Sequence, residues 1–532
     1  MRFSSIRLVF AVGVLCACGR EVGLSPDLVV LNANVITVDE TRPRAEALAV
    51  LDGKFVAVGI EAEIEALVGE GTRVIDAAGR TVTPGFIDAH MHPSPTYPPD
   101  SRLARVDLRP SSVSTMEALI ESLRAKASKT PEGEWVQGRG YEDTKLGRHP
   151  TRRDLDLAST AHPIYITHSS GHLGVVNSFV LKSSGISAKT PDPPGGAIDR
   201  DPDGEPNGVC REGACGMVRR GVSPESPPTR QEAVAGVTRT FQRFASEGIT
   251  TVVDARASPR SFGVYQEIVR AGSPVRITVM FAHRYLERLK EMGIRMGLGS
   301  EWLRVGGIKT SHGNSLSGRT AWLNEPYEAT NPETGKRDYY GIPPRRSQVE
   351  LDALILEIHE ADFQAAVHSN GDREIEMLLV AFDRALREIP WEDHRHRIEH
   401  ASVANPAILS GVKELGLVLA LHSYVYEHGD KMEAYGASRW GMMHANRSAL
   451  DLGIPVAGNS DFPVSAADPL LRIQSMVTRT SAEGKVYGEE QRVTPEEAIH
   501  IWTMGSAYSI FEEGNRGSIE GGKGADFVLL SD

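Results

Sequence analysis

Two histidines, His90 and His92, directly follow an apolar stretch of strand length at residues 85–89. Side chains two residues apart on a strand point to the same side, so both imidazoles can face one point at the carboxyl end of that strand. Neutral imidazole is a common ligand of zinc and related divalent metals. A His-x-His pair carries little weight by itself in a chain with 17 histidines, but its place at a strand end predicts a metal site.

Further residues with metal-binding or acid–base chemistry stand at the ends of other apolar stretches, namely Lys309, His368, His400 and Asp461. The carboxyl ends of barrel strands are where such groups are presented. A lysine inside an apolar strand is costly to bury unless it is neutralised or paired. Carbamylation of Lys309 by CO2 is one solution, because it turns the amine into an anionic ligand that can bridge two metals.

Eight apolar stretches alternate with longer helical segments, which is typical of βα units and a parallel sheet. Three intervening helices are predicted at residues 231–247, 348–361 and 373–387. This α/β pattern predicts a (β/α)8 TIM barrel. The eight predicted strands are residues 85–89, 249–254, 275–281, 306–310, 364–368, 397–400, 417–421 and 454–458.

A strand-like sequence rich in β-branched residues precedes the barrel, and residues 517–530 show the same pattern. We therefore expect a small composite β-sandwich, formed by residues 18–84 and 505–532, beside a barrel domain at residues 85–504. An insertion at about residues 93–230 follows the first barrel strand. Active sites of barrels are built from the loops after the strands, so this insertion is expected to cover the mouth.

The first residues predict an export signal at residues 1–17. Arg2 and Arg7 precede an apolar stretch that is too short to span a bilayer, and small residues follow it. The Leu-Cys-Ala-Cys ending resembles a bacterial lipobox, in which Cys18 is lipidated and becomes the mature N-terminus. Ordinary signal cleavage without a lipid is the alternative. We expect an exported, lipid-anchored protein of the bacterial cell envelope.

The composition is that of a globular protein, with 40% hydrophobic and 24% charged residues. A formal net charge of −12 argues against nucleic acid or an anionic membrane surface as a partner. We expect a small-molecule substrate and membrane contact only through the lipid at Cys18, while a homo-oligomer stays compatible with the sequence. Export permits a disulfide between Cys210 and Cys215, but two free thiols fit as well.

Taken jointly, several motifs make the chain similar to the amidohydrolase superfamily in its binuclear form. More narrowly, the chain resembles the YtcJ-like amidohydrolases of amidohydrolase family 3, which include N-substituted formamide deformylase. This resemblance implies the barrel fold and a hydrolase. The matching text lies at residues 83–92, 150–156, 171–172, 176–178, 192–196, 319–321, 367–368, 371–373, 397–400 and 460–463.

The resemblance also implies a role for each residue at a strand end. It implies one or two divalent ions per chain, with Zn2+ as the expected metal. The first metal is matched by His90, His92 and Asp461, and the second by His368 and His400, with carbamylated Lys309 as the bridge. The metals would polarise the scissile carbonyl and lower the pKa of a bridging water. Asp461 would accept the proton of that water and pass it to the leaving amine.

Four residues are weaker candidates for substrate contact: His172, Arg319, His312 and His422. His172 stands in a motif shared with the family, and a structural loop histidine is the alternative. For Arg319 the alternative is a local ion pair. His312 and His422 have two alternatives, an extra metal ligand or a hydrogen-bonded polar residue. His394 and His396 alternate with arginines and are expected to be solvated.

The favoured function is hydrolysis of a C–N bond in a small molecule, namely an amide, an N-acyl amine or an N-formyl amine. A cyclic-amide or deaminase-type hydrolase is an alternative on the same barrel, although deaminases usually have a glutamate where this chain has residues 369–372. Ester or lactone hydrolysis is also open, because the same hydroxide attacks those carbonyls. A non-catalytic, ligand-binding surface lipoprotein is the alternative outside the enzymes.

Overall fold

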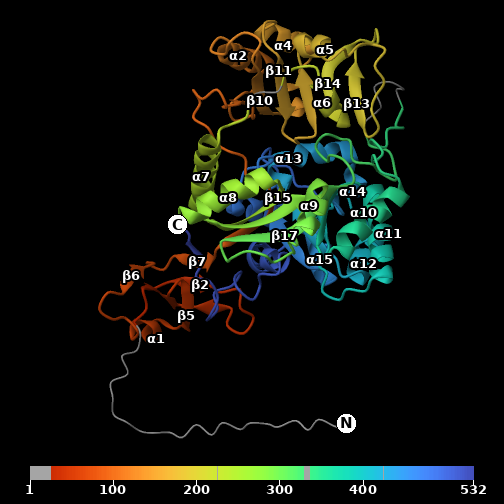
Figure 1. The fold of residues 1–532 in the computed structure, drawn as a ribbon. Coiled ribbons are helices and arrows are strands. Elements are labelled where there is room, and N and C mark those ends of the chain that lie inside the picture. Colours follow the sequence, from red (N-terminus) through yellow and green to blue (C-terminus); the bar gives the residue numbers. More distant parts are fainter. Residues whose placement is uncertain (1–24, 224–225, 329–335, 423, 532) are drawn as a thin grey trace, which may run out of the picture.

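The computed structural model describes residues 25–223, 226–328, 336–422 and 424–531 (Figure 1). The predicted signal at residues 1–17 and the lipid-attachment residue Cys18 lie outside these ranges, so export and lipid anchoring stay predictions. Over the described ranges, no helix combines the length and the apolar composition that a membrane span needs.

An eight-stranded sheet forms the centre of the protein, in the order β21-β20-β19-β18-β17-β16-β15-β8. Neighbouring strands pair in parallel throughout. The end strands also meet, because the backbone N–H of Asp461 donates to the carbonyl of His90 at 3.0 Å. The predicted (β/α)8 barrel is confirmed, with strands at Phe86–Met91 (β8), Ile249–Ala257 (β15), Arg276–Ala282 (β16), Leu303–Ser311 (β17), Ala365–Ser369 (β18), Arg397–His400 (β19), Val418–His422 (β20) and Val456–Asn459 (β21).

Helices cover the outside of the barrel, and side chains fill its inside, so most barrel strands are buried along their whole length. The three predicted helices are present as α7 (Arg230–Ser246), α10 (Gln348–Glu360) and α11 (Asp372–Glu388). Thr229 and Ser347 cap α7 and α10 by accepting a backbone N–H of the first turn. Other helices around the barrel are α8 (Pro259–Arg270), α9 (Leu286–Glu291), α12 (Pro406–Glu414), α15 (Asn446–Asp451), α16 (Pro469–Thr478) and α17 (Pro495–His500).

Two four-stranded sheets form a smaller unit from both ends of the described chain, as predicted. Their orders are β5-β4-β1-β6 and β22-β7-β2-β3. β22 pairs antiparallel with β7, so a strand near residue 528 completes a sheet that begins near residue 34. Val35, Phe55, Val82 and Ile519 are buried in one apolar cluster there. The strands are Leu28–Leu31 (β1), Asn34–Ile36 (β2), Arg44–Ala45 (β3), Ala47–Leu51 (β4), Lys54–Gly59 (β5), Arg73–Asp76 (β6), Thr81–Pro84 (β7) and Phe527–Leu529 (β22).

The segment between β8 and α7 folds around a six-stranded sheet in the order β13-β14-β12-β11-β10-β9. This sheet and the composite sheets lie on opposite sides of the barrel (Figure 1). Its elements are Val106–Asp107 (β9), Met116–Ala127 (α2), Val136–Tyr141 (β10), Asp143–Leu146 (α3), Arg152–Ala158 (α4), Ile164–His168 (β11), Leu173–Val176 (β12), Ser178–Ser183 (α5), Gly196–Arg200 (β13), Pro206–Glu212 (β14) and Gly213–Met217 (α6).

Ion pairs attach this insertion to loops that follow the barrel strands. Arg319, which follows β17, pairs with Asp143. Lys431, in α13 (Val425–Met432) after β20, lies 3.2 Å from a carboxylate oxygen of Glu142. Both contacts join the start of α3 to the carboxyl end of the barrel, so the insertion contacts the mouth side of the barrel.

The packing of β21 generates a stability prediction. A Cβ atom at Gly458 would lie 2.7 Å from the indole ring of Trp502, which is fully buried. Gly458→Ala is expected to lower the free energy of unfolding by about 1–3 kcal/mol, because the overpacked ring cannot move without shifting the core. Chemical denaturation measures this loss. Gly216→Ala is the matched control, since a Cβ there meets nothing within 4 Å; an equal loss in both variants would contradict the packing argument.

Candidate metal centre

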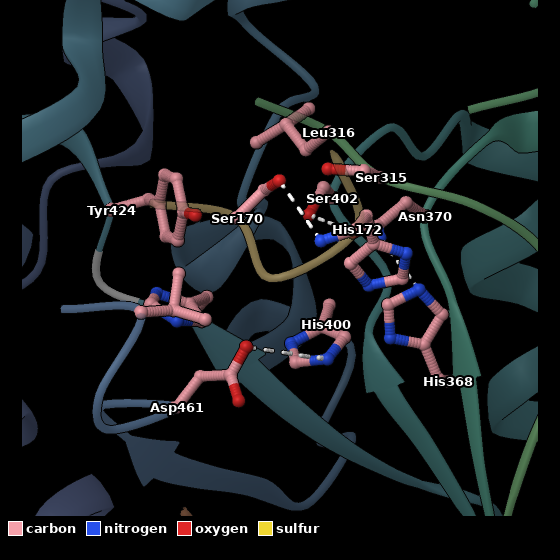
Figure 2. A pocket seen from close by; sticks show the side chains of 12 residues that line it. Ser170, His172, Ser315, Leu316, His368, Asn370, His400, Ser402, Tyr424 and Asp461 are labelled. Carbon is pink, nitrogen blue, oxygen red and sulfur yellow. Dashed lines mark hydrogen bonds and ion pairs between the residues drawn. The ribbon is translucent and has the colours of Figure 1, made fainter. Parts of the chain in front are cut away.

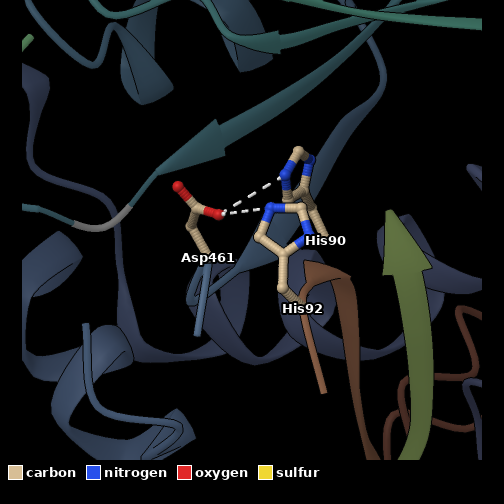
Figure 3. A group of neighbouring side chains, drawn as sticks. All are labelled: His90, His92 and Asp461. Carbon is tan, nitrogen blue, oxygen red and sulfur yellow. Dashed lines mark ion pairs between the residues drawn. The ribbon is translucent and has the colours of Figure 1, made fainter. Parts of the chain in front are cut away.

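The histidine pair and Asp461 form one group at the carboxyl ends of β8 and β21 (Figure 3). The Nε2 atoms of His90 and His92 lie 3.5 Å and 3.3 Å from Oδ1 of Asp461. The candidate ligand atoms of these three residues all lie within 4.8 Å of one another. That spacing lets one ion contact all three side chains.

A second group shares Asp461. The candidate ligand atoms of His400, His422 and Asp461 also lie within 4.8 Å of one another. Nε2 of His400, at the end of β19, is 4.0 Å from Oδ2 of Asp461. The ring of His368, on β18, has its centroid 4.7 Å from that of His400. The rings of His90 and His400 are 4.8 Å apart, so the two groups are contiguous.

Lys309 lies inside the same cluster. Its side chain is buried on β17, and its Nζ is 3.5 Å from Nε2 of His90. Burial lowers the pKa of Lys309 to about 8, against the opposing charges of Glu399 and Asp461. A lower pKa raises the fraction of neutral amine, which is the form that reacts with CO2. The structure therefore brings all six predicted ligands together, while their roles stay predictions.

A buried ion pair orients His90. Nδ1 of His90 is hydrogen-bonded to the carboxylate of Glu399. The guanidinium of Arg397 donates to both oxygens of that carboxylate, at 2.7 and 2.9 Å. Because the hydrogen bond to Glu399 occupies Nδ1, the Nε2 lone pair of His90 is left to face Asp461. Glu399 is absent from the predicted site residues, although a carboxylate inside a barrel strand signals a buried partner.

His368 is oriented in a similar way by a backbone group. Its Nε2 lies 3.0 Å from the carbonyl oxygen of Asn314. When Nε2 donates to this carbonyl, Nδ1 keeps its lone pair; the amide nitrogen of Asn370 also lies 3.2 Å from Nε2. The side-chain amide of Asn370 donates to the same carbonyl at 2.7 Å. This arrangement leaves one nitrogen of His368 suited to metal binding.

A cavity opens beside the cluster (Figure 2). Asp461, His368, His400 and His422 line it together with polar and apolar side chains from the insertion and the mouth loops, which include Ser170, His172, Ser315, Leu316, Asn370 and Tyr424. The cavity thus places any bound molecule against the candidate ligands.

His172 is the predicted substrate contact that the insertion supplies to this cavity. Its ring stacks on that of His368, with centroids 4.9 Å apart. Its Nδ1 lies 2.7 Å from the carboxylate of Glu212, which also accepts hydrogen bonds from the backbone of Ser315 and the hydroxyl of Thr320. Burial favours the neutral ring, but the Glu212 carboxylate outweighs it and raises the pKa of His172. Glu212 therefore positions His172 at the join of insertion and barrel.

Of the other three predicted substrate contacts, one lies at the cavity and two do not. His422 lines the cavity, whereas Arg319 and His312 are not among its lining residues. Arg319 instead pairs with Asp143. His312 is buried after β17, and burial lowers its pKa to about 4.

The two cysteines for which a disulfide and free thiols were both open, Cys210 and Cys215, are buried and free in the structure.

The expectation that His394 and His396 are solvated is wrong. Their exposed fractions are 4% and 0%. His396 accepts the backbone N–H of Ala365 through Nδ1, and its Nε2 lies 2.9 Å from Nδ1 of His359. His394 contacts the carbonyl of Leu415. The alternation with arginines suggested exposure, but the groups that bury these histidines come from other segments of the chain.

The closed barrel and its site define a TIM-barrel protein that carries clustered histidines, a buried lysine and a shared aspartate at the carboxyl ends of its strands. The profile of the Amidohydrolase family matches residues 73–532. The chain belongs to this family, and the predicted resemblance is confirmed.

Relatives align along nearly the whole chain. The putative amidohydrolase YtcJ of Bacillus subtilis is 28% identical over 512 residues, with 93% of each chain covered. N-substituted formamide deformylase of Arthrobacter pascens is 27% identical, with 95% of this chain and 93% of that one covered. Protein LONG AFTER FAR-RED 3 of Arabidopsis thaliana is 28% identical, with 96% and 88% covered. An uncharacterised metal-dependent hydrolase from Pyrococcus horikoshii OT3 has the same fold, with a TM-score of 0.72, 23% identity, and 95% and 97% of the chains covered.

The ion pair behind His90 generates a second prediction. Glu399→Gln is expected to weaken metal binding by about 10–100-fold, because an amide orients and polarises the imidazole less than a carboxylate does. Competition with a chromophoric chelator measures the affinity. Glu360→Gln, at an exposed position near the end of α10, is the control. Unchanged affinity in a folded Glu399→Gln protein would show that Glu399 does not act through His90.

Proposed function

We propose that this member of the amidohydrolase family is a metal-dependent hydrolase that cleaves a C–N bond in a small molecule, namely an amide, an N-acyl amine or an N-formyl amine. The position of Asp461 carries the proposal. Its carboxylate belongs to both ligand groups and also lines the cavity, so one side chain can contact an ion and a reacting molecule. The similarity to N-substituted formamide deformylase supports a C–N bond as the target.

The donor set fits a divalent ion, for which we propose Zn2+. Imidazole nitrogen and carboxylate oxygen are usual zinc ligands. Oδ1 of Asp461 is buried and has no hydrogen-bond donor among the residues that the structure describes, and a cation would satisfy it. When bound, the metal supplies polarisation of the substrate carbonyl and a lower pKa for water. We further propose that Lys309, as a carbamate, is part of the same ligand set.

The side chains around the cavity divide the remaining work. Asp461 accepts the proton of the attacking water at a carboxylate oxygen and returns it to the leaving nitrogen. His172, which Glu212 and the ring of His368 hold in place, forms a polar wall that orients the substrate.

Metal content tests the proposed centre. The wild-type protein is expected to hold about two ions per chain, and Lys309→Ala to hold fewer, because the variant loses the bridging ligand. Elemental analysis of the purified proteins measures this. About one ion per chain, unaffected by Lys309→Ala, would contradict the bridged centre and favour a mononuclear, deaminase-type site.

Turnover tests the role of Asp461. Asp461→Asn is expected to lower kcat/KM by about 10²–10⁴-fold on the best substrate from a panel of N-formyl and N-acyl amines, since it removes the proton acceptor. Asp203→Asn, at an exposed turn of the insertion, is the control. Cyclic amides, esters and lactones belong in the same panel, and preference for one of them would replace the proposed bond. No turnover of any member by metal-loaded protein would favour the ligand-binding alternative.

A further inference from the structure

His422 occupies a position that the six-ligand set does not include. It ends β20, and its side chain is 2% exposed. It lines the same cavity as Tyr424, His400 and Asp461. Its ring centroid is 5.7 Å from that of His400, and a candidate ligand atom of His422 lies within 4.8 Å of those of His400 and Asp461.

Neither ring nitrogen of His422 makes a hydrogen bond of full geometry in the described part of the chain, and the backbone of Ser460, which lies near the ring, can pair with only one of its two nitrogens. A buried imidazole in that state costs free energy, because it has lost its hydrogen bonds to water. The neighbouring Tyr424 does not remove this cost. Its ring meets His422 edge-on, with centroids 4.1 Å apart, and its hydroxyl is directed to Ser317. A ligand that accepts the nitrogen lone pair would remove it.

His400 and Asp461 present their free atoms on the same side. Oδ2 of Asp461 is 4.0 Å from Nε2 of His400, while Oδ1 of Asp461 is directed to His90 and His92. One oxygen of Asp461 thus faces His90 and His92, and the other faces His400. Two imidazoles and one carboxylate oxygen are donors of the kinds that zinc sites use.

We propose that His422 is a ligand of the second metal ion and binds it together with His400 and Asp461. The inference rests on the proposed metal-dependent function, which it deepens by adding a ligand from the seventh barrel strand. The ligands are of the borderline kind that suits Zn2+ or Co2+. An ion bound by His422 would lie near Tyr424, which lines the cavity, as well as near the strands that carry His368 and Lys309.

Metal titration of the full chain tests this inference without relying on activity. Chelator-stripped protein is titrated with Co2+ by calorimetry and by visible absorption. The wild type is expected to show two binding events. His422→Gln is expected to weaken one of them by at least about 10-fold, and to alter the Co2+ absorption of that site, because glutamine has no ring nitrogen. His444→Gln is the matched control: His444 is equally buried and has no hydrogen-bonded ring nitrogen in the described chain, but it belongs to neither ligand group.

A second variant keeps the test decisive if His422→Gln does not fold. His422→Cys retains a side chain that binds these metals as a thiolate. It is expected to give a thiolate-to-Co2+ charge-transfer band, which arises only if residue 422 touches the ion. Two wild-type binding events in His422→Gln, with an unchanged spectrum, would overturn the inference and leave the proposed function standing. The absence of metal binding by the wild type would overturn the proposed function itself, and this inference with it.

Discussion

Hydrogen bonds between the first and last barrel strands bring together ligands that are far apart in the sequence, and the metal centre depends on this closure. The backbone N–H of Asp461 donates to the carbonyl of His90, so the aspartate and the histidine pair stand on adjacent backbones. Asp88 reinforces the join, because its buried carboxylate accepts the backbone N–H and the hydroxyl of Ser460. A shift of either strand would separate ligand atoms that now lie within 4.8 Å.

The barrel interior keeps a charged pair where apolar packing would be less costly. Arg397 and Glu399 are both fully buried, and removing such charges from water offsets most of their mutual attraction. The guanidinium has a further hydrogen-bond partner, since Arg397 also donates to the carbonyl of Ala89. Its effect is felt at His90, whose ring it fixes through Glu399. We interpret the pair as a device for orientation, with little expected gain in stability.

The insertion contributes to the site through a strained residue. Glu212 has φ +50° and ψ −124°, a conformation that side-chain-bearing residues rarely adopt. Its carboxylate contacts His172 in the insertion and Ser315 and Thr320 after β17. The local cost is therefore compensated by bonds that hold insertion and barrel together at the cavity.

The barrel, the composite sheets and the candidate ligands at the strand ends could be predicted from the sequence. Each of these depends on local patterns, since apolar runs specify strands and a parallel barrel gathers its strand ends at one mouth. The contact partners of the buried polar residues became clear only in the folded structure. Glu399 is hydrogen-bonded to His90, and His422 lies close to Asp461. His394 and His396 are buried. All of these contacts join segments that are distant in the chain. Such contacts depend on how strands and loops pack in space, and no local spacing encodes them.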